Sequence, residues 1–264
     1  MKRTGCTLLL ALVLLCFVSC EDRRQQSPDL VAIPVEKWSE DSSYSTVAGQ
    51  PALLLGFDLR TDTFDFVRWR DVVKTIGKSG GNYLRIDTSG IASDELVQLY
   101  EIASGAGVVL DTGNAIDGTA LSVASSVNQF NRYLLAGSRG AVFTEYDQRK
   151  LNALRGLRTV HRRMPMWTLS MDTSILGDLN YSAVTAAGNG RGSYLIYAAT
   201  VGRINLTLDA EQVPRRVSVV GHLGTQRSEI LRPPYDRHFS LLSNEERGGW
   251  ILIEPLTIGK PGDK

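Results

Sequence analysis

The chain has 264 residues, of which 43% are hydrophobic and 22% are charged, and its formal net charge is +1. This composition is typical of a globular protein with room for one large domain or two modest ones, and it excludes a chain that is disordered throughout. The near-neutral charge gives no basic face for nucleic acid, so we expect no nucleic-acid partner.

The first twenty residues have the pattern of a bacterial export signal. An apolar run from Leu8 to Leu15 follows two basic residues, and charge returns abruptly at Glu21. The run is shorter than the ~20 residues that a membrane-spanning helix needs. Ser19-Cys20 resembles a bacterial lipoprotein box, which implies a signal peptide over 1–19, a lipid on the Cys20 sulfur and attachment to a membrane face of the cell envelope.

The remaining chain begins with a polar segment and contains no further cysteine. All three cysteines lie at or before Cys20, so no disulfide, thiolate metal site or catalytic thiol is expected beyond it. Residues 20–46 are mostly charged, amide and hydroxyl residues and are interpreted as a tether. The three histidines lack the spacing of metal ligands, and we expect neither a metal nor a cofactor.

The stretch from Leu53 to Asp87 predicts a strand, a helix and a second strand, with an acid at the end of each strand. An apolar run over 53–57 stops at Asp58. The following helix has one apolar face at the i, i+3, i+4, i+7 spacing of a buried stripe: Trp69, Val72, Val73 and Ile76. Alternating residues from Tyr83 to Asp87 predict the second strand, and a strand, helix, strand order of this length favours parallel pairing.

Further units of the same kind follow within residues 47–187. Strands are predicted at Val108–Leu110, before Asp111, and at Ala141–Thr144, before Glu145. Apolar helix faces are predicted at Leu96, Leu99, Tyr100 and Ala103; at Val123, Val127, Phe130 and Leu134; and at Leu151 and Leu154. Ser93 and Asp147 are suited to cap the first and the last of these helices.

From about Gly190 the period changes. Short β-rich runs follow at even spacing, separated by Gly, Pro and Asn, and no helix pattern is visible. This pattern predicts an antiparallel β-sandwich over residues 188–264, with the domain boundary in Ala186–Gly192.

Several phrases of the chain resemble secreted bacterial glycoside hydrolases that have a TIM-type (β/α) barrel followed by a β-sandwich of the collagen-binding type. The matching phrases are VAGQPALLLG at 47–56, GGNYLR at 80–85, FNRYLLAG at 130–137, GSYLIY at 192–197 and GWILI at 249–253. The resemblance implies an α/β plus all-β fold and carbohydrate as a partner. The inherited name of the last domain does not by itself imply affinity for collagen.

The chain departs from this family in its length. A complete barrel takes about 250 residues and eight strands, whereas residues 47–187 supply about four strand and helix units, so we expect an incomplete or shortened barrel. In the family the catalytic carboxylates sit on the fourth and a later strand, often with an Asn-Glu pair at the acid. The only such pair after the third predicted strand is Asn244-Glu245, inside the sandwich. No catalytic pair is therefore carried over from the family. Whether a homo-oligomer completes the barrel is left as an open alternative.

One set of candidate site residues follows from the strand ends alone. Parallel sheets form their active sites at the carboxyl ends of their strands. Four acids are predicted at such strand ends: Asp58, Asp87, Asp111 and Glu145. Asp111 and Glu145 are the candidate catalytic pair, since two carboxylates about 5 to 10 Å apart can divide the acid and nucleophile or base roles of glycoside hydrolysis. Asp58, Arg85 and Asp87 are candidate substrate ligands. The same acids could instead be helix caps and turn formers.

Among the four tryptophans, Trp167 is the candidate sugar platform, because it lies in an irregular stretch after Pro165. Trp69 and Trp250 fall in a helix face and a strand and are expected in the core.

Two functions remain open. One is a surface-anchored lipoprotein that binds a glycan without hydrolysing it. The other is an active glycoside hydrolase that uses a carboxylate pair at the strand ends, in a compact or dimer-completed barrel.

Overall fold

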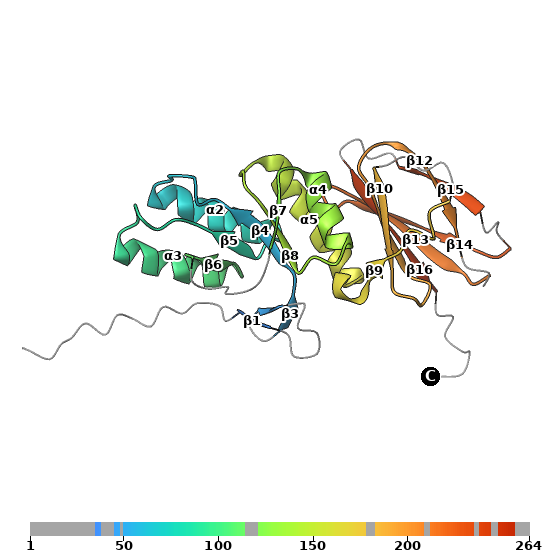
Figure 1. Ribbon diagram of the computed structural model, residues 1–264, viewed down its shortest axis with the longest axis horizontal. Helices are drawn as coiled ribbons and strands as arrows, with labels where there is room; N and C mark the ends of the chain where they lie inside the picture. Colours follow the sequence, from blue (N-terminus) through green and yellow to red (C-terminus); the bar gives the residue numbers. More distant parts are fainter. Residues whose placement is uncertain are drawn as a thin grey trace, which may run out of the picture. The chain divides into compact units, whose positions relative to one another are not determined.

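The computed structural model describes residues 35–37, 45–47, 50–113, 121–177, 183–208, 212–234, 238–243 and 248–256 (Figure 1). The predicted signal peptide with Cys20 and most of the predicted tether lie outside the described residues. A small antiparallel sheet, β1 (Val35–Lys37), β2 (Ser45–Val47) and β3 (Gln50–Ala52), precedes the main fold. No helix in the described ranges is long and apolar enough to cross a membrane.

The first main layer is a parallel sheet with four helices. Its strands are β4 (Leu54–Asp58), β5 (Tyr83–Arg85), β6 (Val109–Asp111), β7 (Ser122–Ala124) and β8 (Gly140–Phe143). The helices are α2 (Phe66–Lys78), α3 (Ser93–Gly105), α4 (Val127–Leu135) and α5 (Gln148–Arg163). The spatial order of the strands is β6-β5-β4-β8-β7, and all neighbouring strands are parallel.

This strand order is that of a ring opened between β6 and β7. Sheet neighbours are consecutive in sequence except at one place, where the first strand, β4, pairs with the last, β8. A doubly wound sheet of the 3-2-1-4-5-6 type would instead place the fourth strand beside the first. The described strands thus form an open five-stranded sheet, not a closed barrel, with β6 and β7 at its edges.

The two faces of the parallel sheet have different neighbours. One face carries Phe57, Leu84, Leu110 and Phe143, which share a hydrophobic cluster with the buried side chains of all four helices. The opposite face carries Leu54, Tyr83, Val109 and Val142, which form a separate buried cluster with Val47 and Leu121. Helices that pack on one face only are the arrangement of a barrel, in which helices lie outside the strands.

The predicted helix patterns are confirmed for α2 and α5. The buried residues of α2 are the four that the apolar stripe predicts, Trp69, Val72, Val73 and Ile76. The Asp147 carboxylate accepts a hydrogen bond from the Lys150 backbone and caps α5 as predicted. For α3, Ala92 occupies the capping position and Ser93 is the first helical residue.

The predicted apolar face that starts at Val123 is wrong at its beginning. Val123 lies in β7 and is 52% exposed, and α4 starts four residues later at Val127. Ser126 has extended backbone angles, and its hydroxyl accepts a hydrogen bond from the Gln129 backbone at 3.3 Å. This cap ends the strand segment and fixes the start of the helix.

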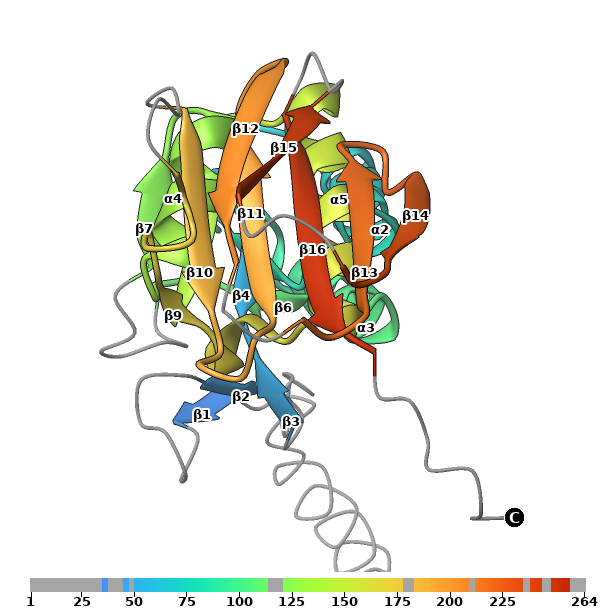
Figure 2. The ribbon, with the colours of Figure 1, turned by 90° about the vertical axis from the view of Figure 1, so that its right-hand side faces the viewer.

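The second part of the fold is antiparallel, as predicted. After a short 3₁₀ turn, η1 (Met166–Thr168), six strands form a sheet in the order β14-β13-β16-β11-β10-β9 (Figure 2). They are β9 (Ser170–Met171), β10 (Val184–Gly188), β11 (Tyr194–Ala198), β13 (Arg215–Gly221), β14 (Gln226–Leu231) and β16 (Gly249–Pro255). A two-stranded sheet, β12 (Gly202–Thr207) and β15 (His238–Ser243), completes this part.

The antiparallel sheet starts before the predicted change of period. Val184–Gly188 is a mostly buried run with small side chains, so its sequence shows no alternation, yet it pairs along its whole length with β11. The shorter β9 starts earlier still, at Ser170, and pairs with β10.

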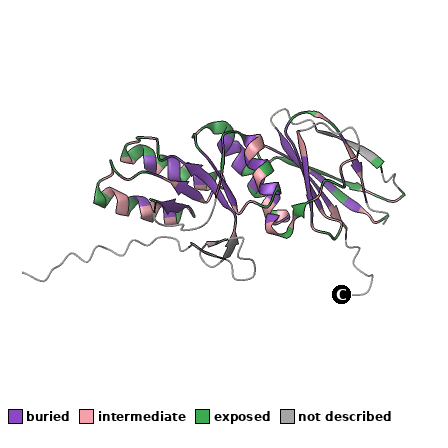
Figure 3. Ribbon diagram, in the orientation of Figure 1, coloured by how far each residue is buried: buried purple, intermediate pink, exposed green. Residues whose placement is uncertain are grey.

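The parallel and antiparallel parts share one core. The cluster that fills the helix face of the parallel sheet also contains Leu195, Tyr197, Val220, Trp250 and Leu252 of the antiparallel sheet. Helix α5 contacts β13 and β16, and α4 contacts β10. Figure 3 shows the buried inner strands and helix sides along this packing.

Candidate functional site

Three of the predicted site residues lie side by side at the carboxyl ends of adjacent strands. In the sheet register, Asp58 pairs with Arg85 and Arg85 pairs with Asp111. Alternation along each strand directs these side chains to the face opposite the helices. The Arg85 Nε donates to the Asp111 Oδ2 at 2.8 Å, and the Arg85 Nη1 lies 3.8 Å from the Asp58 Oδ2.

Further donors hold the two carboxylates. The Tyr83 hydroxyl donates to the Asp111 Oδ2, and the Gly113 backbone N–H donates to its Oδ1 at 2.8 Å. Arg60 donates two parallel hydrogen bonds to Asp58, from Nε to Oδ1 at 2.9 Å and from Nη2 to Oδ2 at 2.8 Å. This bidentate geometry is the strong form of an arginine–carboxylate pair.

The surroundings of Asp111 fix its charge. Burial acts to raise the pKa of Asp111, but the hydrogen bonds from Tyr83, Gly113 and Arg85 outweigh it and lower the pKa below its ordinary value. Burial and the hydrogen bond to Asp111 raise the pKa of the Tyr83 phenol. Around neutral pH the network therefore contains an ionised Asp111 and a neutral Tyr83, and Asp111 has no proton to give.

Asp87 lies outside this network and lines an adjoining pocket. Its carboxylate accepts the Ser89 backbone N–H at 2.9 Å, which is the turn-forming role that the sequence left open. The pocket has a volume of about 290 Å³ and is also lined by Asp62, Phe64 and Arg60. Because Arg60 also binds Asp58, the pocket and the ion pairs of Asp58 are neighbours at the carboxyl end of the sheet.

Glu145 is not brought together with Asp111. Its side chain is 78% exposed and pairs at 2.7 Å with Lys150 of α5, which also lies 3.2 Å from Asp147. The Lys150 ammonium lies 5.8 Å from the ring centre of Phe143, a residue of the helix face. The predicted catalytic pair thus falls into two separate ion-pair groups. Strand alternation does not govern Glu145, because β8 ends two residues before it.

Trp167 lies toward the other end of the sheet. Its half-buried indole contacts the His161 ring edge-on, with ring centres 4.6 Å apart. His161 lines a cavity with Leu53, Asn82 and Gly107, which precede β4, β5 and β6. These are the amino ends of the strands, whereas Arg85 is the last residue of β5. Trp167 therefore does not share a site with Arg85.

Sequence reasoning missed Arg60 and Tyr83. The position of Tyr83, two residues before Arg85 in a strand, places both on one face and could have indicated the contact. Arg60 lies in a loop, where no periodicity predicts direction. Within the described ranges, no group of three or more His, Cys, Asp or Glu side chains could hold a metal ion.

No protein-family model matches this sequence, and no curated protein matches it either. Among solved structures, one described as a glycoside hydrolase is similar with a TM-score of 0.62 at 8% identity, covering 84% of this chain and 97% of that one. A second, a glycoside hydrolase family 5 structure from Bacteroides vulgatus ATCC 8482, has a TM-score of 0.60 at 9% identity, covering 84% and 93%. Both matches take in the parallel and the antiparallel parts together, since they span most of each chain. The protein therefore has a glycoside hydrolase-like fold.

Proposed function

We propose that this protein is a surface-anchored glycan-binding or accessory lipoprotein that does not hydrolyse its ligand. The observation that carries this proposal is the row Asp58, Arg85 and Asp111, in which the carboxylates of Asp58 and Asp111 are both paired with arginine side chains. The resemblance of Ser19-Cys20 to a lipoprotein box supports the anchor.

The chemistry of the row argues against catalysis. Glycoside hydrolysis needs one carboxylic acid with a raised pKa and a second carboxylate about 5 to 10 Å away. Burial acts to raise the pKa of Asp111, but the hydrogen bonds from Tyr83, Gly113 and Arg85 together lower it, so Asp111 is not suited to the acid role. Asp58 gives both oxygens to Arg60, and Glu145 pairs with Lys150 outside the row.

The strand order supports the same conclusion. The resembling hydrolases carry a catalytic acid on their fourth strand, whereas the fourth strand of the described sheet along the chain, β7, pairs with β8 and not with β6. Ser125 and Ser126 follow the end of β7, and neither is a carboxylate.

The pocket beside the row is suited to bind a sugar. Asp62, Asp87 and Arg60 offer charged hydrogen-bonding groups, and the partly exposed Phe64 offers aromatic surface. A few polar groups beside aromatic side chains are the usual lining of a site for a small polar ligand.

Calorimetric titration of the full chain with a panel of oligosaccharides tests this proposal. We expect at least one glycan to bind, and Asp87→Asn to weaken its binding by roughly tenfold through loss of a charged hydrogen bond. Asp94→Asn, in the exposed first turn of α3, is the matched control and should leave affinity within about twofold. Absence of binding to every glycan would overturn the proposal.

The second candidate is an active hydrolase, and one observation favours it: Asp62 and Asp87 line the same pocket. Two carboxylates in one open pocket could form an acid and base pair. This candidate requires product formation that both Asp62→Asn and Asp87→Asn abolish.

A further inference from the structure

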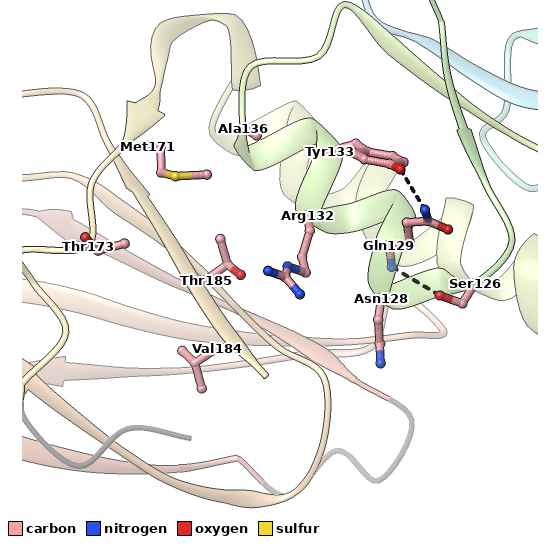
Figure 4. A pocket seen from close by; sticks show the side chains of 10 residues that line it. All are labelled: Ser126, Asn128, Gln129, Arg132, Tyr133, Ala136, Met171, Thr173, Val184 and Thr185. Carbon is pink, nitrogen blue, oxygen red and sulfur yellow. Dashed lines mark hydrogen bonds between the residues drawn. The ribbon is translucent and has the colours of Figure 1, made fainter. Parts of the chain in front are cut away.

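Another pocket, of about 620 Å³, lies between α4 and the antiparallel sheet (Figure 4). One wall comes from α4 and includes Asn128, Gln129, Arg132 and Tyr133. The facing wall includes Met171 of β9 and the strand β10. Its volume lies in the range of small-ligand sites.

Hydrogen bonds fix the amide groups of the α4 wall. The Gln129 Oε1 accepts the Ser125 backbone N–H at 2.9 Å, and its Nε2 donates to the Tyr133 hydroxyl at 2.6 Å. The Asn128 Oδ1 accepts the Tyr197 hydroxyl of β11 at 2.8 Å. Since the Asn128 Oδ1 already accepts a hydrogen bond, the Asn128 amide N–H₂ is left as a donor.

Arg132 gives the pocket its charge. In Figure 4 its side chain extends from α4 toward Val184 and Thr185 of β10. None of the ten described residues that line the pocket is acidic, and Arg132 forms no ion pair with another described residue. A guanidinium with neutral donors beside it is suited to a planar or tetrahedral anion, which it can bind with two hydrogen bonds.

We propose that this pocket binds an acidic sugar unit, whose carboxylate or sulfate group pairs with Arg132. The Asn128 amide then donates to a ring substituent, and Met171, which is 53% exposed, offers apolar surface to the C–H face of the sugar. This inference rests on the proposed glycan-binding function and names its ligand class.

Calorimetry with the full chain separates the inference from the function on which it rests. The probes are uronate-containing and sulfated oligosaccharides, each compared with a neutral oligosaccharide of the same length. We expect the acidic probes to bind, with affinity that falls as salt concentration rises, and Arg132→Gln to weaken their binding by roughly tenfold.

Two further variants control for charge and for folding. Arg227→Gln removes the same charge from exposed β14, at the opposite edge of the antiparallel sheet from β9, and should change affinity by less than about twofold. Ala136→Trp places a bulky ring at the exposed rim of the pocket without a change of charge, and should also weaken binding.

The outcomes are distinct. Binding of neutral glycans alone, unaffected by Arg132→Gln, would overturn the acidic-sugar pocket and leave the proposed function intact. An equal loss in Arg132→Gln and Arg227→Gln would also overturn it, because binding would then depend on overall charge. Failure of every glycan to bind would overturn both proposals.

Discussion

Arg85 donates a hydrogen bond of 2.8 Å to Asp111 across two adjacent parallel strands, although 26 residues separate them in sequence. The register of the sheet aligns the carboxyl ends of β5 and β6 and so creates this pair. It also pairs the buried Asp111 carboxylate with a cation, and several expectations depend on this pair.

Replacement of Arg85 should destabilise the protein strongly. In Arg85→Met, the buried Asp111 loses its cation, and Asp58 keeps only Arg60. An uncompensated buried charge typically costs about 3 kcal/mol. Urea unfolding should show a loss of that order, whereas exposed Arg227→Met should change the free energy of unfolding by less than about 0.5 kcal/mol. Equal small effects would show that the row contributes little to stability.

The lowered pKa of Asp111 predicts a loss of stability in acid. A carboxyl whose pKa is lower in the folded state stabilises the protein above its unfolded pKa, and this contribution disappears as pH falls through the folded pKa. The free energy of unfolding should therefore decrease as the pH is lowered below about 4. Asp111→Asn, compared by urea unfolding across this range, should have a shallower pH dependence. An unchanged slope would contradict the assignment.

His161 predicts a second, separate pH effect. Burial lowers its pKa from 6.5 to about 4, so the folded state favours the neutral ring. The contribution to stability is complete above pH 6.5 and is lost as pH falls from 6.5 toward 4, because the unfolded chain takes up the proton first. NMR titration of the His161 ring should give a midpoint near 4. A midpoint near 6.5, the value of an exposed histidine, would contradict the partly buried position of the ring.

Helix α5 should not tolerate a methyl group where it meets the antiparallel sheet. A Cβ at Gly156 would lie 2.8 Å from the Gly221 carbonyl oxygen, so the backbone must shift. Gly156→Ala should destabilise by about 2 kcal/mol despite the better helix propensity of alanine. Gly105→Ala is the control, since nothing lies within 4 Å of its new Cβ. It should be neutral or slightly stabilising in the same urea titration.

The proposed anchor predicts covalent lipid on Cys20. Cells that express the full chain should incorporate labelled fatty acid into it, and Cys20→Ala should abolish the label. Retention of label in Cys20→Ala would place the modification on another residue. A chain that never takes up label would contradict the proposed lipid anchor.

Local patterns predicted the helices and the aligned strand ends well. The stripe of α2 was readable because its four apolar residues, at helical spacing, are also its four buried ones. The meeting of Asp58, Arg85 and Asp111 followed from parallel pairing, which places strand ends at one edge.

The sequence failed where side-chain direction is not set by a strand or where a strand is very short. Asp87 and Glu145 lie beyond the last residues of β5 and β8, so strand alternation no longer fixes which way they point. The three-residue β7 was missed because Val123 fits a helix period, and its exposure leaves no buried alternation to find. The partnership of Arg60 with Asp58 arises from loop geometry that no period encodes.

Product formation from a glycan that the protein binds would decide whether the protein only binds its ligand or also hydrolyses it. The full chain would be incubated with the bound oligosaccharide at high enzyme concentration, and mass spectrometry would follow the appearance of shorter sugars. We expect intact ligand after prolonged incubation. Shorter products that disappear in Asp62→Asn and Asp87→Asn would contradict this expectation and identify the protein as a hydrolase.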